Sequence, residues 1–178
     1  MNLLGAKDEE IARSIFPYED LTGEQCFKLV RIEPNQHLFS VLSATQIGRI
    51  YRYTMKEWNK PKHDGPFTAF ANYDSTLKFY KTMSGRPLYS EYYAIAICDY
   101  ELSEYRYLWV SLVGDHEEPK DMEELYANRQ ANINIMKRFP IGTILCKRLR
   151  PYAIVKNEYI GSTAQRMVLE HNIPTIYL

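Results

Sequence analysis

The sequence contains few cysteines, and their arrangement excludes two common roles of this residue. Cys26, Cys98 and Cys146 are the three cysteines among 178 residues, and they lie far apart. No C-x-x-C pair or mixed cysteine–histidine cluster occurs, so we expect no zinc site and no other bound metal. Each cysteine lies within an apolar stretch. This pattern predicts buried, reduced thiols and a reducing compartment.

Long apolar runs are also absent. No stretch approaches the length of about 20 apolar residues that a bilayer-spanning helix needs. The first residues include Lys7, Asp8, Glu9 and Glu10, where a secretory signal peptide has its apolar segment. We therefore expect a cytoplasmic protein that has no membrane partner.

The chain has no net charge, because its 22 Lys and Arg residues balance its 22 Asp and Glu residues. A protein that wraps nucleic acid usually has a clear basic excess, so extensive non-specific binding to nucleic acid is not expected. The charges are nevertheless segregated along the chain. Acidic residues concentrate at 99–124, and basic residues concentrate at 49–62 and 137–150. This distribution predicts a dipolar surface that orients a charged partner.

Motifs of the common enzyme classes are missing as well. The chain has no G-x-x-x-x-G-K-[ST] or G-x-G-x-x-G phosphate loop and no G-x-S-x-G nucleophile elbow. Its four histidines stand apart from one another in the sequence, so they indicate no catalytic or metal-binding pair. The sequence alone does not assign an activity. The leading hypothesis is a small binding module that has a protein partner and no cofactor.

Apolar periodicity and turn residues predict one domain over residues 1–178. Apolar residues make up 46% of the chain and charged residues 25%, which is typical of globular proteins. Alternating patterns predict strands at 26–33, 37–42, 50–55, 67–71, 92–100, 105–113, 143–155 and 173–178. The turn residues Pro34-Asn35-Gln36 predict that the first two strands form a hairpin, and Pro151 predicts a bend in the strand at 143–155. Helical spacing and capping residues predict helices at 7–16, 75–83, 122–139 and 162–171. Asp74 is the predicted N-cap of the helix at 75–83, and Ser162 with Gln165 forms a predicted capping box for the last helix. We therefore expect an α+β fold with a curved, mostly antiparallel sheet of seven or eight strands and three or four helices.

The segment 92–100 is strongly apolar and predicts an interior strand of this sheet. Alternation places Ile95 and Ile97 on one face and Ala94, Ala96 and Cys98 on the other. The small side chains of the second face suggest that a helix packs closely against it.

Aromatic residues are abundant, with 15 Tyr, 7 Phe and 2 Trp, and some alternate with cations at 49–62. Aromatic rings and cations together suit a nucleotide or single-stranded nucleic acid, because rings stack on bases and cations meet phosphates. The simpler interpretation is a solvated strand whose basic side chains cover aromatic surface. The candidate ligand-binding residues are Tyr51, Tyr53, Trp58, Lys60 and Lys62.

Several short motifs follow one another between Lys28 and Val155. They are Lys28-Leu29-Val30-Arg31, Leu38-Phe39-Ser40, Tyr51 with Glu57-Trp58 and Pro61, Gly65-Pro66-Phe67-Thr68-Ala69-Phe70, Tyr107-Leu108-Trp109 and Gly142-Thr143-Ile144-Leu145. In order and spacing the chain resembles a loose group of small bacterial and phage α+β proteins that have no assigned chemistry. That resemblance implies one compact domain.

A second pattern consists of His37 on an early strand, Thr68 with Tyr73, and Glu158 late in the chain. In this order the residues resemble those of ADP-ribosyltransferase-like domains. The resemblance implies that His37 holds the ribose of NAD, that an aromatic ring stacks on nicotinamide, and that Glu158 stabilises the oxocarbenium ion. It makes an NAD-consuming transferase the alternative to the binding module, and NAD would be its only cofactor.

Overall fold

Strands make up the largest part of the regular secondary structure in the described chain. The computed structural model describes residues 10, 24–32, 34, 38–40, 51–61, 65–84, 90–106, 108–111, 129–131, 139–157 and 159–178. Its strands are β1 (Gln25–Ile32), β2 (Leu38–Ser40), β3 (Arg52–Tyr53), β4 (Phe67–Phe70), β5 (Tyr93–Leu102), β6 (Trp109–Ser111), β7 (Arg129–Ala131), β8 (Thr143–Val155) and β9 (Thr175–Ile176). Its helices are α2 (Tyr73–Ser84), α5 (Ser162–Glu170) and a short 3-10 helix, η1 (Ser90–Tyr92).

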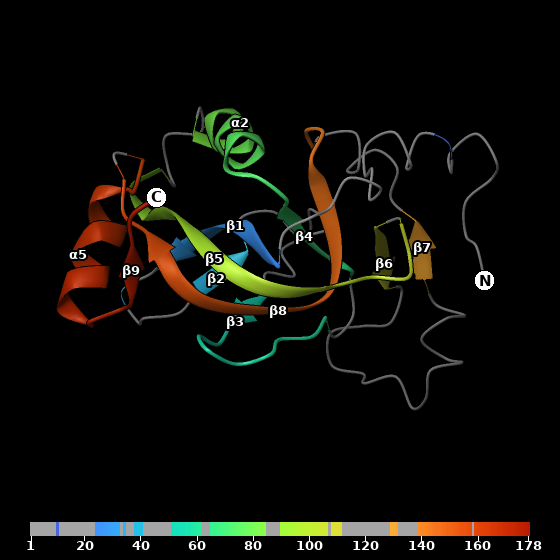
Figure 1. Ribbon diagram of the computed structural model, residues 1–178, viewed down its shortest axis with the longest axis horizontal. Helices are drawn as coiled ribbons and strands as arrows, with labels where there is room; N and C mark the ends of the chain where they lie inside the picture. The colour runs from blue at the N-terminus through green and yellow to red at the C-terminus, as the bar shows by residue number, and fades with distance from the viewer. Residues whose placement is uncertain are drawn as a thin grey trace.

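Four of these strands close into a barrel. β8 lies between β4 and β5, and β1 pairs with both β4 and β5, so the order β1–β4–β8–β5 returns to β1. All four pairings are antiparallel. β2 and β3 extend the sheet from β1, and β9 joins β8 in parallel (Figure 1). β6 and β7 form a separate two-stranded sheet.

The predicted fold class is therefore wrong in its architecture. We expected a curved sheet of seven or eight strands with three or four helices. The structure has a closed four-stranded barrel with additional strands, and two α-helices in the part of the chain that it describes. Sequence periodicity could not reveal the closure, because it identifies the buried face of a strand but not the strand that lies along each edge.

The prediction of an interior strand is confirmed by β5, which pairs with β1 on one edge and β8 on the other. Ile95 and Ile97 belong to one apolar cluster, whereas Ala94, Ala96 and Cys98 belong to the second. The second cluster fills the barrel interior with alternate residues of all four strands. A four-stranded barrel has a narrow interior, which explains the small side chains of β5 at these positions.

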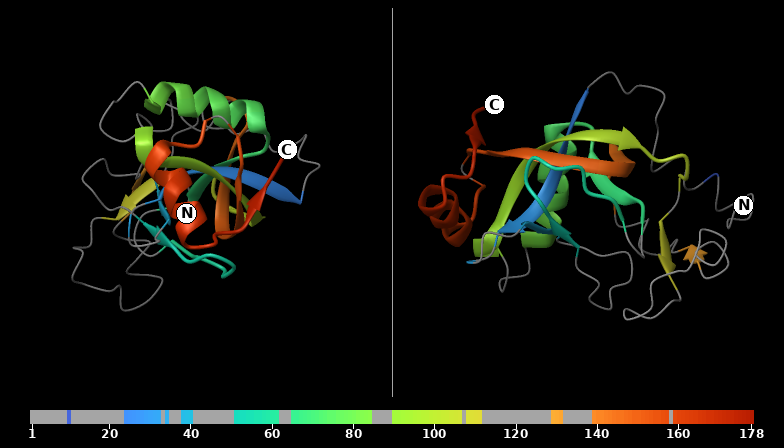
Figure 2. Two further views of the ribbon diagram at one scale, coloured as in Figure 1. Left: turned by 90° about the vertical axis from the view of Figure 1, so that its left-hand side faces the viewer. Right: turned by 90° about the horizontal axis from the view of Figure 1, so that it is seen from below.

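The two helices occupy different places on the barrel. α2 packs across its outer surface, where the buried Phe79 joins the cluster of Ile95 and Ile97 (Figures 1 and 2). α5 lies at one end of the barrel, and its buried Ala164 and Met167 join the interior cluster. Within the described residues, a helix therefore meets the small-residue face only at this end. Neither helix is both long enough and apolar enough to span a membrane.

The long strand β8 spans Thr143–Val155, which are the predicted boundaries. A bend was expected at Pro151, and the pairing with β5 shifts there: Ile97 faces Ala153 whereas Cys98 faces Pro151. A second shift lies between Glu101 and Leu102. Such bulges bend a strand and increase its twist, which allows β8 to curve around the barrel.

The predicted helix at 122–139 is wrong where the structure describes it. Arg129–Ala131 is strand β7, which pairs antiparallel with β6. A pairing between distant segments has here overridden the local helical spacing. Residues 122–128 and 132–138 lie outside the described residues, as do those of the predicted helix at 7–16 apart from Glu10, which is helical.

Two predicted helix caps are also wrong. The side chain of Asn72, rather than that of Asp74, caps α2, because Asn72 Oδ1 accepts a hydrogen bond from the Ser75 backbone N–H at 2.8 Å. The N-cap of α5 is Gly161, which forms no side-chain cap, so the expected capping box at Ser162 is not formed.

The turn before β8 requires glycine at position 142. Gly142 has a φ of +96°, and a Cβ placed there would lie 2.4 Å from Ser75 Oγ. The Ser75 hydroxyl donates a hydrogen bond of 2.7 Å to the carbonyl of Ile141, and the Ala71 N–H donates one of 2.9 Å to the Gly142 carbonyl. The close approach of this turn to the start of α2 therefore excludes a side chain.

Candidate functional site

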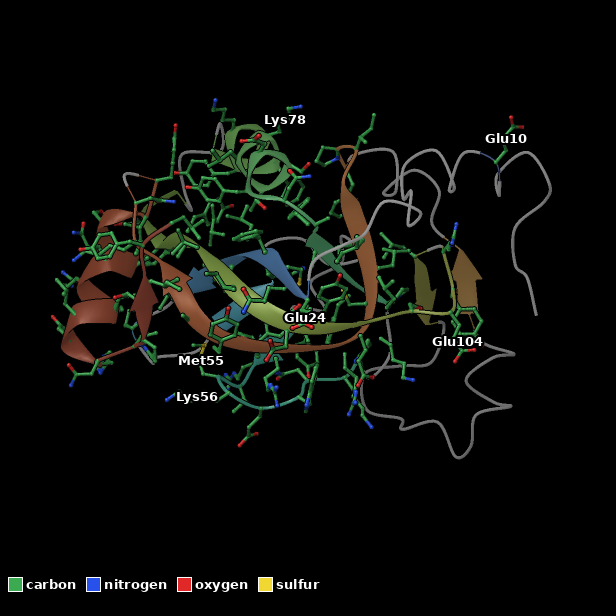
Figure 3. The ribbon with its side chains drawn as sticks, in the orientation of Figure 1. Glu10, Glu24, Met55, Lys56, Lys78 and Glu104 are labelled. Atoms are coloured by element: carbon green, nitrogen blue, oxygen red, sulfur yellow. The ribbon has the colours of Figure 1, made fainter. Side chains whose placement is uncertain are left out.

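A surface centred on Trp58 is the first candidate site. We name it the Trp58 face, and it comprises Trp58, Lys60, Asp99, Glu101, Lys147, Arg148 and Arg150. Its residues come from the loop after β3 and from the paired strands β5 and β8. Figure 3 shows Met55 and Lys56, at the start of this loop, on the opposite side of the barrel from Lys78 of α2.

The Trp58 ring lies against two arginines. The guanidinium carbons of Arg148 and Arg150 are 4.7 Å and 4.6 Å from its centroid. Arg148 and Arg150 are two residues apart on β8 and therefore point to the same side. Cations in such positions are attracted by the face of an indole. The indole is half-buried, so part of it remains open to solvent.

Each arginine also pairs with a carboxylate directly opposite on β5. Arg150 Nε donates a hydrogen bond of 2.9 Å to Asp99 Oδ2, and Arg148 Nε donates one of 2.9 Å to Glu101 Oε2. Arg148 is bidentate, because its Nη2 donates to Glu101 Oε1. These bonds to Arg148 lower the pKa of Glu101, and the positive charges of Lys147 and Lys60 contribute to the same shift.

The loop that bears Trp58 is held to β8 by the next residue, Asn59. Asn59 N–H donates to the Leu149 carbonyl at 2.8 Å, and Leu149 N–H donates back to the Asn59 carbonyl at 3.1 Å. The Asn59 amide also bonds to both backbone groups of Thr54, which closes the turn. Trp58 is therefore held in place through the backbone of its neighbour.

The predicted ligand-binding residues do not all reach this surface. Trp58 and Lys60 belong to the Trp58 face. Tyr53 is 2% exposed, and its ring packs against those of Tyr51 and Phe67 at 4.9 Å and 5.2 Å between centroids. Tyr51 is half-buried. A buried Tyr53 offers no stacking face to a ligand at the surface, and Lys62 lies outside the described residues.

The barrel interior holds a second candidate, the buried Lys28. Its Nζ donates hydrogen bonds to the Thr68 carbonyl at 2.5 Å and to Thr68 Oγ1 at 3.1 Å. The described β1–β4 pairing consists of Phe27 opposite Phe70. The Lys28 ammonium therefore bonds to β4 at Thr68, two residues from the paired Phe70. Burial lowers the pKa of Lys28 to about 8, from its ordinary value of 10.5.

Three thiols and a phenol surround this lysine. The Cys26 thiol contacts those of Cys146 and Cys98, and burial together with these contacts raises the pKa of Cys26 well above its ordinary value. The Tyr53 ring centroid lies 6.0 Å from Lys28 Nζ. The Tyr53 hydroxyl is buried and has no hydrogen-bond partner among the described residues. All three cysteines are buried and unpaired, as the sequence predicted.

Two of the four residues proposed for the transferase hypothesis, His37 and Glu158, lie outside the described residues. Thr68 is buried and accepts a hydrogen bond from Lys28. Tyr73, the fourth, accepts a hydrogen bond from the side-chain amide of Asn157, the neighbour of Glu158 in sequence. The structure therefore places Tyr73 beside Asn157.

Sequence reasoning missed the role of Arg148 and Arg150, which we had grouped with a separate basic cluster. Their spacing of two on a predicted strand was a usable signal for a shared face, but nothing local linked them to Trp58. Lys28 was also missed. Its signal was alternation with the apolar Cys26 and Val30, which predicts an inward-facing lysine.

No group of His, Cys, Asp and Glu among the described residues is arranged to hold a metal ion. Comparisons with protein-family models, with curated proteins and with solved structures found no match to this chain.

Proposed function

We propose that this chain is a small non-catalytic binding module that contacts a protein partner through the Trp58 face. The observation that supports this proposal is the Trp58 indole, which lies partly exposed across Arg148 and Arg150. Tryptophan and arginine are enriched among the residues that dominate the energy of protein interfaces.

The charges of the Trp58 face favour an acidic partner. Its four cations, Lys60, Lys147, Arg148 and Arg150, outnumber its two carboxylates. The ion pairs on β5 and β8 satisfy much of the hydrogen-bonding capacity of the arginines, whereas Lys60 and Lys147 are exposed. Lysines at such a rim attract carboxylates of a partner and increase the association rate.

Preorganisation adds to this proposal. The cross-strand ion pairs restrict Arg148 and Arg150, and Asn59 fixes the backbone beside Trp58. Side chains that are already ordered lose less conformational entropy when a partner binds, so a larger share of the contact energy appears as affinity.

The test compares the proteins that co-purify with three forms of the chain in quantitative mass spectrometry. We expect a partner to be retained by wild type and by Lys78→Ala, an exposed change on α2 on the opposite side (Figure 3). The same partner should be lost, by about tenfold or more, from Trp58→Ala. A partner that binds Trp58→Ala as well as wild type would overturn the assignment of this face.

A second candidate is the binding of single-stranded nucleic acid at the same face, favoured by the partly exposed Trp58 indole and by Lys60 and Lys147, whose charges both act on Glu101 of this face. One stacked base contributes about 1–3 kcal/mol, so Trp58→Ala would weaken binding about tenfold. A titration with a fluorescent oligonucleotide at low and moderate salt tests this candidate. Binding that weakens steeply with salt and is lost in Trp58→Ala would favour nucleic acid over a protein partner.

The transferase hypothesis predicts a different result. Purified wild-type protein would release nicotinamide from NAD, and Glu158→Gln would abolish the release without a large change in melting temperature. Nicotinamide release that depends on Glu158 would contradict the proposal of a non-catalytic module and support the transferase hypothesis.

We also propose a cytoplasmic location, supported by the three unpaired, buried thiols. Reduced thiols are typical of a reducing compartment. Fractionation of cells that produce the chain, with immunodetection, tests this location.

A further inference from the structure

Cys26 and Cys98 lie directly opposite each other on the antiparallel strands β1 and β5. Opposed residues of such a pair have Cα atoms about 4.5 or 5.5 Å apart. Both separations fall within the range that a disulfide spans without backbone movement. The thiols of Cys26 and Cys98 also contact each other in the barrel interior.

On one edge of β5, Cys98 lies near the end of the strand pairing, and on the other edge the pairing is irregular at Cys98. On the β1 side, the β1–β5 ladder ends one pair beyond Cys26 and Cys98, at Gln25 and Asp99. On the β8 side, Cys98 faces Pro151, which has no N–H to donate, and the pairing shifts between Ile97 and Cys98. Ladder ends and irregular pairings open locally at low free-energy cost.

Such local opening is what two buried thiols need in order to react. In the closed barrel both thiols are shielded, and burial keeps Cys26 protonated. Gln25 is exposed beside Cys26, so fraying of the terminal pairs brings solvent and a small oxidant to the thiols. The nearby ammonium of Lys28, which interacts electrostatically with all three thiols, favours the thiolate once the site opens.

We propose that Cys26 and Cys98 form a reversible cross-strand disulfide when the chain meets a low-molecular-weight disulfide. One thiolate attacks a sulfur of the oxidant, which releases its other sulfur as a thiolate. The second cysteine, after losing its proton, displaces the remaining half of the oxidant. In total one S–S bond forms in the protein and one breaks in the oxidant, while two protons pass to the released thiols.

This inference is independent of the Trp58 face. It assigns a modification site in the barrel interior that joins the two strands through which the barrel closes. Cys146, which contacts Cys26 from β8, is expected to remain a free thiol. Because Cys26 contacts both other thiols, the identity of the linked pair is the critical result.

The experiment oxidises the folded, reduced protein with oxidised glutathione at mildly alkaline pH. Remaining thiols are then blocked with N-ethylmaleimide in denaturant, and the chain is mapped by mass spectrometry. We expect the intact mass, before blocking, to be lower by two hydrogens, the link to join Cys26 with Cys98, and Cys146 alone to carry the blocking group. A parallel oxidation in urea should give all three possible pairings.

Two variants sharpen the result. Cys146→Ala should still form the link between Cys26 and Cys98. Cys98→Ala should form no efficient link between Cys26 and Cys146, so Cys146 should still carry the blocking group. Three blocked thiols after oxidation, a persistent glutathione adduct, or a native link that includes Cys146 would each overturn the proposal. The wild-type map decides the question even if a variant fails to fold.

Discussion

The substitution Lys28→Met tests the energetics of the barrel interior. Methionine has a similar length to lysine and removes the charge. In the folded chain the pKa of Lys28 is lowered to about 8, from 10.5, because the ammonium is buried. The unfolded chain therefore binds this proton more tightly than the folded chain does. The stability attributable to Lys28 is lowest below pH 8 and rises as the pH increases from 8 to 10.5.

The magnitude follows from the two pKa values. A fall from 10.5 to about 8 corresponds to about 3 kcal/mol of unfolding free energy between low and high pH. Between pH 7 and 9.5, wild type should gain about 2 kcal/mol relative to Lys28→Met. The raised pKa values of Cys26 and Tyr53 act in the opposite direction, because their contribution is lost as the pH rises. Both groups are present in both proteins, so the difference between the proteins reports the titration of Lys28 together with its electrostatic effect on the neighbouring thiols.

Urea unfolding, followed by circular dichroism at pH 7, 8, 9 and 9.5, measures this difference. The exposed Lys78→Met on α2 serves as the control and should follow wild type at each pH. The absolute stability of Lys28→Met also reflects the lost hydrogen bonds to Thr68, so the test depends on the slope with pH. Parallel curves for wild type and Lys28→Met would refute the reasoning that burial dominates the energetics of this ammonium.

Three further substitutions test other parts of the structure. Gly142→Ala should destabilise the chain by about 1–3 kcal/mol in urea unfolding, because φ is positive there and the new methyl would collide with Ser75; unchanged stability would contradict the turn geometry. Tyr53→Phe should raise the melting temperature slightly, because it removes a buried hydroxyl that has no partner among the described residues; a clear loss of stability would show that the hydroxyl is bonded. Arg148→Ala should raise the pKa of Glu101 toward its ordinary value in an NMR titration, and an unchanged titration would remove Arg148 as the main cause.

The sequence predicted individual strands well where alternation was bounded by turn residues. The boundaries of β8 and the two faces of β5 were foreseen, because side chains alternate along a strand whatever its partners are. The hairpin of β1 and β2 was also foreseen, from the turn residues between two alternating segments.

Features that depend on distant pairings were not predicted. The closure between β1 and β5 joins residues about 70 positions apart, and no local pattern records such a contact. The same holds for the candidate site. Trp58 and Lys60 were named from their own segment, but the bridge from Asn59 to Leu149 is what brings Arg148 and Arg150 beside them.

The position of β8 has a consequence for how the chain folds. This strand is the last of the four barrel strands in the chain and joins β4 to β5, and both partners precede it by dozens of residues. Such a high contact order slows folding, because the entropy of closing long loops is lost before the pairing contributes. During synthesis, β4 and β5 emerge before β8, so the edge of each strand that pairs with β8 remains unpaired until β8 has been made. That interval leaves open sheet edges in a nascent chain, and open edges favour pairing with other chains.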